Sequence, residues 1–370
     1  MREGWEYKKL GDLCDIYQPK TLATEQLVAD GKYYVYGANG IIGRYNDYNH
    51  EQSEILLTCR GATCGTINIS QPYSWINGNA MVIHRKSEDL SFDFLKYLML
   101  SLDYSLIITG AAQPQITRQK IAPIIVKFPS LSVQQSIVSE LDKINELIRL
   151  KKEQLKDYDN LAQSIFYEMF GDPVVNEKGW EVKKLIETVV LECTISYGIV
   201  QPGDGVEDGI PVVRPIDLTG TFVSTNNLKK TTEKISSSYS RTILTGKELL
   251  VCVRGTTGVC SLVTDELKGC NVTRGITPLL FNDNTDRWFM YYQFQMPQIK
   301  CIIADYTKGI TLKQINMADF RKIPVILPPL PLQQLFAQRI ELIEKQKAEI
   351  QSTIADLETL LASRMQYWFD

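Results

Sequence analysis

Two short segments rich in glycine and threonine could bind an anion or the edge of a base. Residues 60–65 begin with Arg60, and residues 254–258 begin with Arg254. Each segment follows an apolar stretch that we interpret as a strand. Free backbone N–H groups and an arginine at a loop tip can bind a phosphate or the acceptor edge of guanine. A tight β-turn with an exposed arginine explains the same pattern equally well, so both interpretations stay open.

A second polar cluster precedes the last strand-like stretch of each half of the chain. It covers residues 110–118 in the first half and residues 309–316 in the second. Gln, Thr, Asn and Arg side chains in these segments can hydrogen-bond to base edges and phosphates. The alternative is a helix start that is capped by Thr117 or Asn316.

The usual catalytic motifs are absent from the sequence. There is no nucleotide-binding P-loop, no nucleophile elbow and no zinc-protease helix, and the chain has two histidines, His50 and His84. Residues 327–330 lack the polar first residue and aromatic last residue of an amino-methyltransferase site, so we interpret them as a corner between domain and helix. The eight cysteines form no C-x-x-C pair, which predicts buried free thiols and no metal site. We therefore expect no catalysis by this chain.

The elements that hold these segments occur twice. Residues 4–10 return as residues 179–185, and residues 128–135 return as residues 327–334. Each copy consists of a globular segment followed by a long amphipathic stretch. Such a duplication builds a pseudo-two-fold object that suits a two-part target, and DNA is the commonest target of that kind.

The long stretches predict two helices of roughly 55–60 Å each, at about 1.5 Å per residue. Their hydrophobic residues recur at spacings of four and three, as in a coiled coil. The first series is broken at Lys151 and the second at Lys347 and Arg364. The two series, related by a shift of 199 residues, are Ile137, Leu141, Ile144, Ile148, Leu155, Tyr158, Ala162, Ile165 and Met169, and then Phe336, Ile340, Ile343, Ile350, Ile354, Leu357, Leu361 and Trp368.

Packing the two helices on each other buries both series, and a two-fold axis makes that packing antiparallel. Lys151 and Lys347 then fall in one layer, with their stems reaching outward toward Glu153 and Glu349. Two independent helical hairpins, each docked on its own domain, remain the alternative. The prolines of the two corners should prevent helix before Leu131 and Leu332.

Short strand-like stretches separated by turn residues dominate both globular segments, which predicts an irregular α+β domain. The clearest strands are at residues 33–36, 54–58, 121–128, 212–213, 249–253 and 323–327, and the clearest helices at residues 92–102 and 286–295. The expected domains are residues 1–130, the helix 131–170, residues 171–329 and the helix 330–370.

Composition is that of an ordinary globular protein, with 44% hydrophobic and 22% charged residues. The net charge of -3 is not the basic excess of a typical nucleic-acid binder. No 18-residue apolar run and no signal-like start are present, so we expect a cytoplasmic protein without a membrane span.

Several strings resemble the specificity subunits of type I restriction-modification systems. Residues 36–43 and 209–215 are similar to runs in the target recognition domains of that family. Trp5 and Trp180 with the lysine and leucine that follow them, the Pro-Leu-x-x-Gln-Gln helix entries and residues 170–173 also match. The resemblance covers essentially the whole chain.

The resemblance implies two α+β target recognition domains separated by an antiparallel two-helix spacer, each reading one half of a bipartite, asymmetric site in double-stranded DNA. It also implies a non-catalytic subunit that binds two methyltransferase subunits, which a restriction and translocase subunit can join. S-adenosylmethionine, ATP and magnesium would belong to those partners, and this chain would hold no cofactor.

DNA-contacting residues vary with the target in that family, so our candidates rest on position in the sequence. We choose polar side chains of the loops described above and of the strands beside them: Asn39, Arg44, Arg60, Thr63, Gln113, Gln115, Arg118, Arg214, Arg254, Thr256, Thr257, Arg274, Lys308 and Lys313. The competing interpretation is a coiled-coil scaffold that joins proteins and does not bind DNA.

Overall fold

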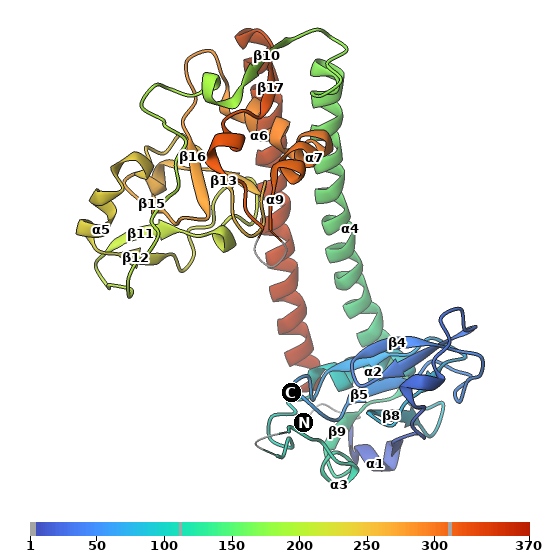
Figure 1. Ribbon diagram of the computed structural model, residues 1–370. Helices are drawn as coiled ribbons and strands as arrows, with labels where there is room; N and C mark the ends of the chain where they lie inside the picture. Colours follow the sequence, from blue (N-terminus) through green and yellow to red (C-terminus); the bar gives the residue numbers. More distant parts are fainter. Residues whose placement is uncertain (1–4, 111–112, 310–312) are drawn as a thin grey trace. The chain divides into compact units, whose positions relative to one another are not determined.

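The computed structural model describes residues 5–110, 113–309 and 313–370, and the chain divides into two compact units (Figure 1). Unit 1 comprises Met1–Lys152 and Ser352–Asp370, and unit 2 comprises Glu153–Gln351. Each unit therefore contains one globular segment together with parts of both long helices.

Unit 1 is an α+β structure with short strands and few helices. Its elements are β1 (Glu6–Lys9), α1 (Leu10–Leu13), β2 (Cys14–Tyr17), η1 (Thr24–Gln26), β3 (Tyr33–Gly37), β4 (Gly40–Tyr45), β5 (Ile55–Thr58), β6 (Ile67–Ile69), β7 (Trp75–Ile76), β8 (Ala80–Arg85), α2 (Phe92–Ser101), α3 (Arg118–Ile121), β9 (Ile125–Phe128) and the first part of α4 (Leu131–Phe170).

Unit 2 has the same character. Its elements are β10 (Glu181–Lys184), η2 (Leu185–Thr188), β11 (Ile210–Val213), η3 (Pro215–Asp217), β12 (Lys229–Thr231), α5 (Glu233–Ser238), η4 (Ser240–Thr242), β13 (Leu249–Cys252), β14 (Cys260–Leu262), η5 (Asp265–Leu267), β15 (Asn271–Val272), β16 (Ile276–Leu279), α6 (Arg287–Gln295), α7 (Pro297–Tyr306), α8 (Met317–Phe320), β17 (Pro324–Leu327) and the first part of α9 (Leu330–Phe369).

The two units share one topology, except that the larger sheet of unit 1 has β2 as a fourth strand. In unit 1 a sheet of order β4-β3-β7 accompanies the sheet β2-β8-β5-β6, and in unit 2 the sheet β12-β11-β15 accompanies β14-β13-β16. The parallel pair β3 and β7 corresponds to the parallel pair β11 and β15. The strand before each Arg-Gly segment, β5 or β13, is flanked by two antiparallel neighbours. The duplication expected from the repeated strings is therefore also a duplication of fold.

The repeated strings form the base of each globular segment. Strand β1 pairs with β9, from Glu6 opposite Phe128, and β10 pairs with β17, from Glu181 opposite Leu327. Each segment thus begins and ends on one two-stranded ribbon, and the long helix leaves directly from its second strand.

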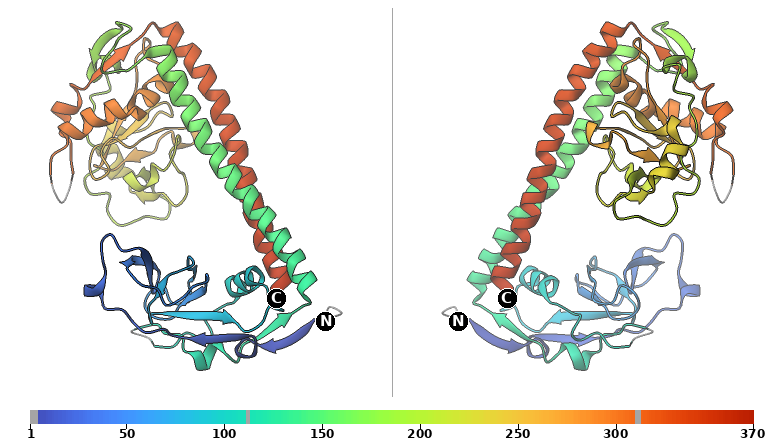
Figure 2. Two further views of the ribbon diagram at one scale, coloured as in Figure 1. Left: turned by 90° about the vertical axis from the view of Figure 1, so that its right-hand side faces the viewer. Right: turned by 90° about the vertical axis from the view of Figure 1, so that its left-hand side faces the viewer.

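The helices α4 and α9 lie side by side and run antiparallel (Figure 2). Within unit 1, Arg364 of α9 pairs with Glu140 of α4, and Lys152 lies 2.8 Å from Glu358. Within unit 2, the rings of Phe166 and Phe336 lie 5.6 Å apart. Partners on α9 move toward lower numbers as α4 advances, which confirms the antiparallel pair expected from the two hydrophobic series.

The buried face of α4 differs from the expected series in its last turns. Ala162, Phe166 and Phe170 are fully buried, whereas Ile165 and Met169, which the heptad spacing predicts, are half-buried. Ile165 and Met169 still pack against the core of unit 2, so the predicted series is incomplete at this end because it omits Phe166 and Phe170. The physical reason is that the helix meets the globular segment as well as α9 here, and Phe166 and Phe170 both pack on Phe289 of α6.

Two further details differ from the sequence predictions. Helix α9 begins at Leu330, so Pro331 lies in its first turn, where the missing N–H needs no acceptor. Lys347 reaches Asp159 and Glu344, each at 2.8 Å, and these are different partners from the expected Glu349. Glu344 lies one turn before Lys347 on α9, and Asp159 lies on the facing helix α4, so both carboxylates are within reach of its half-buried ammonium.

A buried glutamine joins each globular segment to its long helix. Gln134 accepts a hydrogen bond from the N–H of Ser91 at 2.8 Å and donates to the carbonyls of Asp89 and Pro129. Ser91 is the N-cap of α2. These bonds hold the start of α4 against the start of α2. The sequence pattern predicted a helix entry here, with no indication that the first glutamine of the pair is buried.

Unit 2 repeats this arrangement in detail. Gln333 accepts from the N–H of Asp286 at 2.8 Å and donates to the carbonyls of Asn284 and Pro328. Asp286 is the N-cap of α6. The first residue of each Gln-Gln pair is therefore a clamp between the domain and the helix.

The predicted strands and helices largely coincide with observed elements. The exception in unit 1 is the strand expected at residues 121–128, because α3 ends at Ile121 and β9 begins at Ile125. In unit 2, α7 had not been predicted. Proline at the first position of α7 favours a helix start. However, α7 begins two residues after α6 ends, so its hydrophobic residues were not recognised as a separate helical pattern.

Candidate nucleic-acid interface

The two polar segments of unit 1, far apart in sequence, lie next to each other. Arg60 and Gln115 form an antiparallel bridge. The N–H of Gly61 donates to the carbonyl of Pro114 at 3.0 Å, and the N–H of Ile116 donates to the carbonyl of Cys59 at 3.0 Å. The Arg-Gly segment and the second polar cluster therefore form one composite loop site.

Unit 2 builds the same site from equivalent bonds. Arg254 and Gln314 form an antiparallel bridge. The N–H of Gly255 donates to the carbonyl of Lys313 at 2.8 Å, and the N–H of Ile315 donates to the carbonyl of Val253 at 3.0 Å. Neither pairing could be read from the sequence, because no local pattern records which loops meet.

A second bridge closes each polar cluster into a hairpin. Thr109 and Gln115 exchange backbone hydrogen bonds of 2.9 and 2.8 Å, and Lys308 and Gln314 exchange two bonds of 2.8 Å. Residues 111–112 and 310–312, between the paired positions, lie outside the described residues. Each of the two glutamines therefore pairs with two backbone segments at once.

The glycine after each arginine has a positive φ angle, a conformation that residues with a side chain rarely adopt. Gly61 has φ of +89° and Gly255 has φ of +86°. No atom of a non-neighbouring residue lies within 4 Å of the position where a Cβ would stand at either glycine. The constraint is therefore the backbone angle and not crowding, and the tip of each turn is open on one side.

The arginines at these turns are available for an outside partner. Arg60 is exposed and Arg254 is half-buried. Among the described residues, neither guanidinium has a hydrogen-bond or ion-pair partner. Thr63, Gln113, Arg118, Thr256, Lys308 and Lys313 are also exposed, while Gln115 and Thr257 are half-buried.

Two other candidates lie beside these loops. Asn39 is at the tip of the β3–β4 hairpin, where Thr58 of β5 donates a hydrogen bond to the carbonyl of Ala38. Arg274 precedes Gly275, whose carbonyl accepts from the N–H of Val253 at 2.8 Å. Both residues are therefore carried to the same edge of their unit as the Arg-Gly turn.

Arg44 and Arg214 are engaged within their own units. Arg44 donates to the carbonyl of Gly31 at 3.1 Å, and its guanidinium lies 4.3 Å from the ring centre of Tyr34. Arg214 makes two bonds to the buried Asp217, at 2.9 and 3.1 Å. The hydrogen bonds to Asp217 raise the pKa of Arg214 above its ordinary value. These contacts supply a structural role for both arginines.

The capping alternative applies to one unit. Asn316 accepts from the N–H of Asp319 at 2.9 Å and so caps α8. Thr117 occupies the same position before α3 without a side-chain capping bond. Gln314 was missed as a candidate, although its spacing of 199 residues from Gln115 was a usable signal once the repeat was known.

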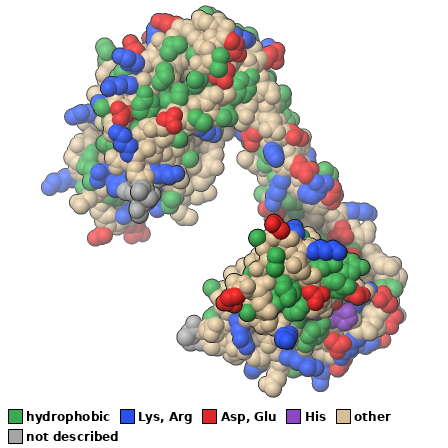
Figure 3. All heavy atoms as spheres, turned by 45° about the vertical axis from the view of Figure 1, so that its right-hand side comes forward, with side chains coloured by type: hydrophobic (Ala, Val, Ile, Leu, Met, Phe, Trp, Pro, Cys, Tyr) green, Lys and Arg blue, Asp and Glu red, His purple; other side chains and the backbone are tan. Residues whose placement is uncertain are grey.

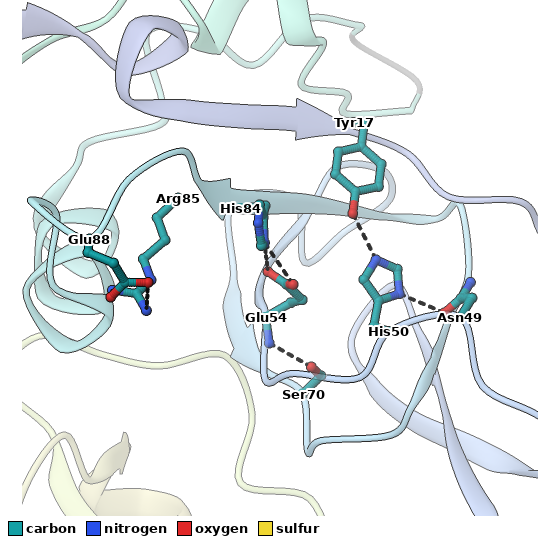
Figure 4. Close-up of polar contacts among 8 residues, drawn as sticks. All are labelled: Tyr17, Asn49, His50, Glu54, Ser70, His84, Arg85 and Glu88. Atoms are coloured by element: carbon teal, nitrogen blue, oxygen red, sulfur yellow. Dashed lines mark hydrogen bonds and ion pairs between the residues drawn. The ribbon is translucent and has the colours of Figure 1, made fainter.

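The two histidines belong to a separate polar cluster in unit 1 (Figure 4). His84 lies 2.8 Å from the buried carboxylate of Glu54, and His50 bonds to Tyr17 at 2.9 Å and to Asn49 at 2.7 Å. Burial, followed by the neighbouring His84, lowers the pKa of His50. Burial raises the pKa of Glu54 despite the nearby His84. The cluster is part of the domain's own hydrogen-bond network.

Within the described ranges, no group of three or more His, Cys, Asp or Glu side chains is placed to hold a metal ion. Five of the cysteines are buried as expected, Cys64 and Cys193 are half-buried and Cys301 is exposed. Burial raises the pKa of the Cys14 and Cys260 thiols to about 12. No helix in the part of the chain that the structure describes is both long and apolar enough to cross a bilayer.

Charges on the molecular surface are mixed. On the face shown in Figure 3, acidic side chains lie among the basic ones on both units. This agrees with the net charge of -3. Within the ranges that the structure describes, the basic groups of the loop sites have no acidic ion-pair partner, and they lie in open turns.

Comparison with known proteins gives consistent matches. The family model for the type I restriction modification DNA specificity domain matches residues 2–157 and 178–359. A protein of Mycoplasma pneumoniae that carries the name of a type I specificity subunit is 24% identical over 342 residues, 90% of this chain and 87% of that protein. The specificity subunit of the type I restriction enzyme EcoBI of Escherichia coli is 22% identical over 224 residues, 60% of this chain and 44% of its own length.

Two solved structures share the fold. The S subunit of a type I restriction-modification system from M. genitalium superposes with a TM-score of 0.58 at 14% identity, covering 99% of this chain and 96% of the other. A chain from a structure that addresses complex assembly of the type I restriction-modification system gives a TM-score of 0.60 at 19% identity, covering 99% and 97%.

Proposed function

The chain belongs to the family of type I restriction-modification specificity subunits, and we propose that each of its two units reads one half of a bipartite DNA site. The observation that carries this proposal is the pair of equivalent loop sites, one in each unit. In each site an Arg-Gly turn is bridged to a glutamine of a polar hairpin.

The chemistry of these sites fits double-stranded DNA. An arginine without an internal partner can bind a phosphate or the O6 and N7 atoms of guanine, and a glutamine can bind the N6 and N7 atoms of adenine. Exposed arginine, lysine and threonine side chains in open turns also suit phosphate oxygens. We assign reading of bases or phosphates to Arg60, Thr63, Gln113 and Gln115 in unit 1 and to Arg254, Thr256, Lys308 and Lys313 in unit 2.

The two sites carry different side chains on one framework, which supports different half-sites and an asymmetric target. Thr109 in unit 1 corresponds to Lys308 in unit 2, and Pro114 corresponds to Lys313. Side chains that differ at equivalent positions present different hydrogen-bonding groups to the base edges. A palindromic target would instead favour equal side chains at these positions.

Catalysis is assigned to partner subunits. The sequence carries no catalytic motif, so we propose that adenine methylation is carried out by two methyltransferase subunits that bind S-adenosylmethionine. ATP and magnesium would serve a restriction subunit where one is present. The outer faces of α4 and α9, which expose leucines such as Leu161 and Leu360, are suitable places for such partners.

A domain exchange tests the proposal. Residues 6–128 are replaced with a second copy of residues 181–327, because both segments begin and end on a paired two-stranded ribbon in the same register. The chimera and the parent chain are each co-expressed with the methyltransferase subunit, and methylated adenines are mapped by sequencing. The parent should give an asymmetric bipartite site and the chimera a palindrome of its second half.

The outcomes separate the alternatives. An unchanged methylation pattern with a folded chimera would refute the assignment of one half-site to each unit. Absence of sequence-specific DNA binding by the parent chain with its partner would favour the scaffold interpretation. Exchange of the loop pair alone, residues 60–65 and 109–118 for residues 254–258 and 308–316, tests whether these loops are sufficient.

A further inference from the structure

Unit 2 contains a cavity of about 640 Å³ that the loop sites do not use. Its walls come from the last part of α4, the first part of α9, helix α6 and residues 219–222. Hydrogen bonds from Leu262 to the carbonyl of Thr221 and from Ser261 to the carbonyl of Gly220 hold the last wall on β14. The cavity is therefore built from fixed elements.

Aromatic side chains form one side of this cavity. Tyr291 and Tyr292 of α6 line it and are buried. Phe222 lines it as well, with 40% of its surface exposed and its ring 5.5 Å from that of Trp288. Three aromatic residues therefore contribute to the lining of the cavity.

Charged side chains form the other side. The ammonium of Lys347 lies 2.8 Å from a carboxylate oxygen of Asp159 and 2.8 Å from one of Glu344. Tyr292 donates a hydrogen bond to Glu344 at 3.1 Å. Burial lowers the pKa of Lys347, but the hydrogen bonds to Asp159 and Glu344 outweigh it and hold the pKa above its ordinary value. Lys347 therefore stays charged, and one ammonium is shared by two carboxyl groups, so acidic groups outnumber basic ones on this side of the cavity.

We propose that this cavity binds an organic cation, either a primary ammonium or a guanidinium group. An excess of acidic groups beside aromatic rings attracts a cation through the ring quadrupole as well as through the carboxylates. An anion would meet two carboxylates that share a single ammonium, and an apolar ligand would leave the polar wall without partners. The side chain of Asp159 is 57% exposed, so it is the carboxylate that an entering cation can reach.

Unit 1 offers a matched control. By the shift of 199 residues that relates the two helices, Asn145 is equivalent to Glu344, and Ile148 is equivalent to Lys347. Asn145 donates to the hydroxyl of Tyr97 at 3.0 Å, and Ile148 is buried. Asp159 corresponds to Glu358, which pairs with Lys152 at 2.8 Å. The charged triad of Asp159, Glu344 and Lys347 is therefore present in unit 2 and has no counterpart at the equivalent positions of unit 1.

The cation has two sources, a free amine or a lysine or arginine side chain of a partner protein. The free source is tested by calorimetric titration and thermal melting of the full chain with putrescine and with arginine. The neutral analogues 1,4-butanediol and citrulline serve as ligand controls. Asp159→Asn and Phe222→Ala each remove one recognition element at a partly exposed position, and Glu358→Gln is the matched variant in unit 1. Circular dichroism checks that each variant is folded.

Saturable binding of an amine, weakened about tenfold by Asp159→Asn or Phe222→Ala and unaffected by Glu358→Gln, would support a free ligand. The partner source rests on the proposed function and is tested by assembly with the methyltransferase subunit. Loss of about tenfold in assembly affinity for the same two variants, without binding of free amine, would support a partner side chain. Equal amine binding by the parent chain and both variants would overturn the proposal. So would a result in which neither variant changes amine binding or assembly. Neither result would bear on DNA reading.

Discussion

Unit 1 and unit 2 share their framework and differ in the groups placed on it. The ribbon at the base, the buried glutamine, the turn glycine and the loop bridge recur with equivalent hydrogen bonds. The sheet β4-β3-β7 carries an aromatic series in which the rings of Tyr33 and Tyr48 lie 5.1 Å apart. The equivalent sheet in unit 2 has Lys229 and Lys230 on β12 instead.

The junction with the long helices shows the same contrast. In unit 2, Phe289 of α6 packs on Phe170 with ring centres 4.8 Å apart, and Phe166 and Phe336 complete an aromatic cluster. In unit 1, Phe94 of α2 packs on Phe369 at 5.5 Å, and Ile137 takes the place of Phe336. The groups that both units share make hydrogen bonds to backbone atoms, which need a partner in each unit. Side chains that only contact each other can differ between the units, as long as both members of a contacting pair change together.

The largest expected effect concerns the shared clamp. Gln333→Leu should lower the free energy of unfolding by about 3 kcal/mol, because the N–H of Asp286 and the carbonyls of Asn284 and Pro328 lose their partners. Gln134→Leu should cost a similar amount in unit 1. Urea denaturation measures both. The neighbouring exposed residues give the controls Gln334→Leu and Gln135→Leu. A loss below about 1 kcal/mol in either clamp variant would contradict the clamp role of that glutamine.

The next effect concerns the loop sites. Arg60→Ala and Arg254→Ala should each weaken DNA binding in the presence of the methyltransferase partner by about 1–3 kcal/mol and leave the melting temperature unchanged. Contact with a phosphate would weaken binding to all sequences and reduce the salt slope by about one, whereas contact with guanine would relax one position of one half-site. Arg214→Ala is the contrasting variant, because loss of its bonds to Asp217 should lower stability. Unaltered binding with lowered stability for Arg60→Ala would assign that arginine to the fold.

A smaller effect is expected at the charged triad of unit 2. Lys347→Ile alone should cost about 1–2 kcal/mol, since it leaves Glu344 and Asp159 without their shared cation. Adding Glu344→Asn reproduces the Asn145 and Ile148 pair of unit 1, and the double variant should recover most of the loss. A double-mutant cycle on unfolding free energies measures the coupling. Strictly additive losses would show that the two positions do not exchange as a pair.

The smallest effect is a difference in acid sensitivity. The pKa of His50 is lowered in the folded chain, so its contribution to stability is present above its ordinary value of 6.5 and is lost as the pH falls below it. Glu54 acts with the opposite sign at lower pH, because burial raises its pKa above 4.5. Unit 2 has no histidine. When the pH falls from about 7 to about 6, the range in which a histidine ordinarily titrates, protection against hydrogen exchange, measured relative to the intrinsic exchange rate at each pH, should therefore decrease more in unit 1 than in unit 2. His50→Gln should reduce this difference.

The sequence by itself determined the duplication, the two long helices and the α+β character of the domains. Repeated strings and heptad spacing are local patterns, and local patterns are set by backbone geometry and by which face of an element is apolar. They also singled out Arg60 and Arg254, because an arginine beside glycine after a strand is a recognisable turn.

Tertiary structure alone decided which segments meet. The bridges from Arg60 to Gln115 and from Arg254 to Gln314 join residues more than fifty positions apart, and hydrogen bonds at that separation leave no local trace. The full burial of Phe166 and Phe170, beside the partly buried Ile165 and Met169, has a similar cause, because the helix must contact its domain as well as α9. The internal bonds of Arg44 and Arg214 were hidden for the same reason, since an arginine's partner depends on which side chains the fold brings near it.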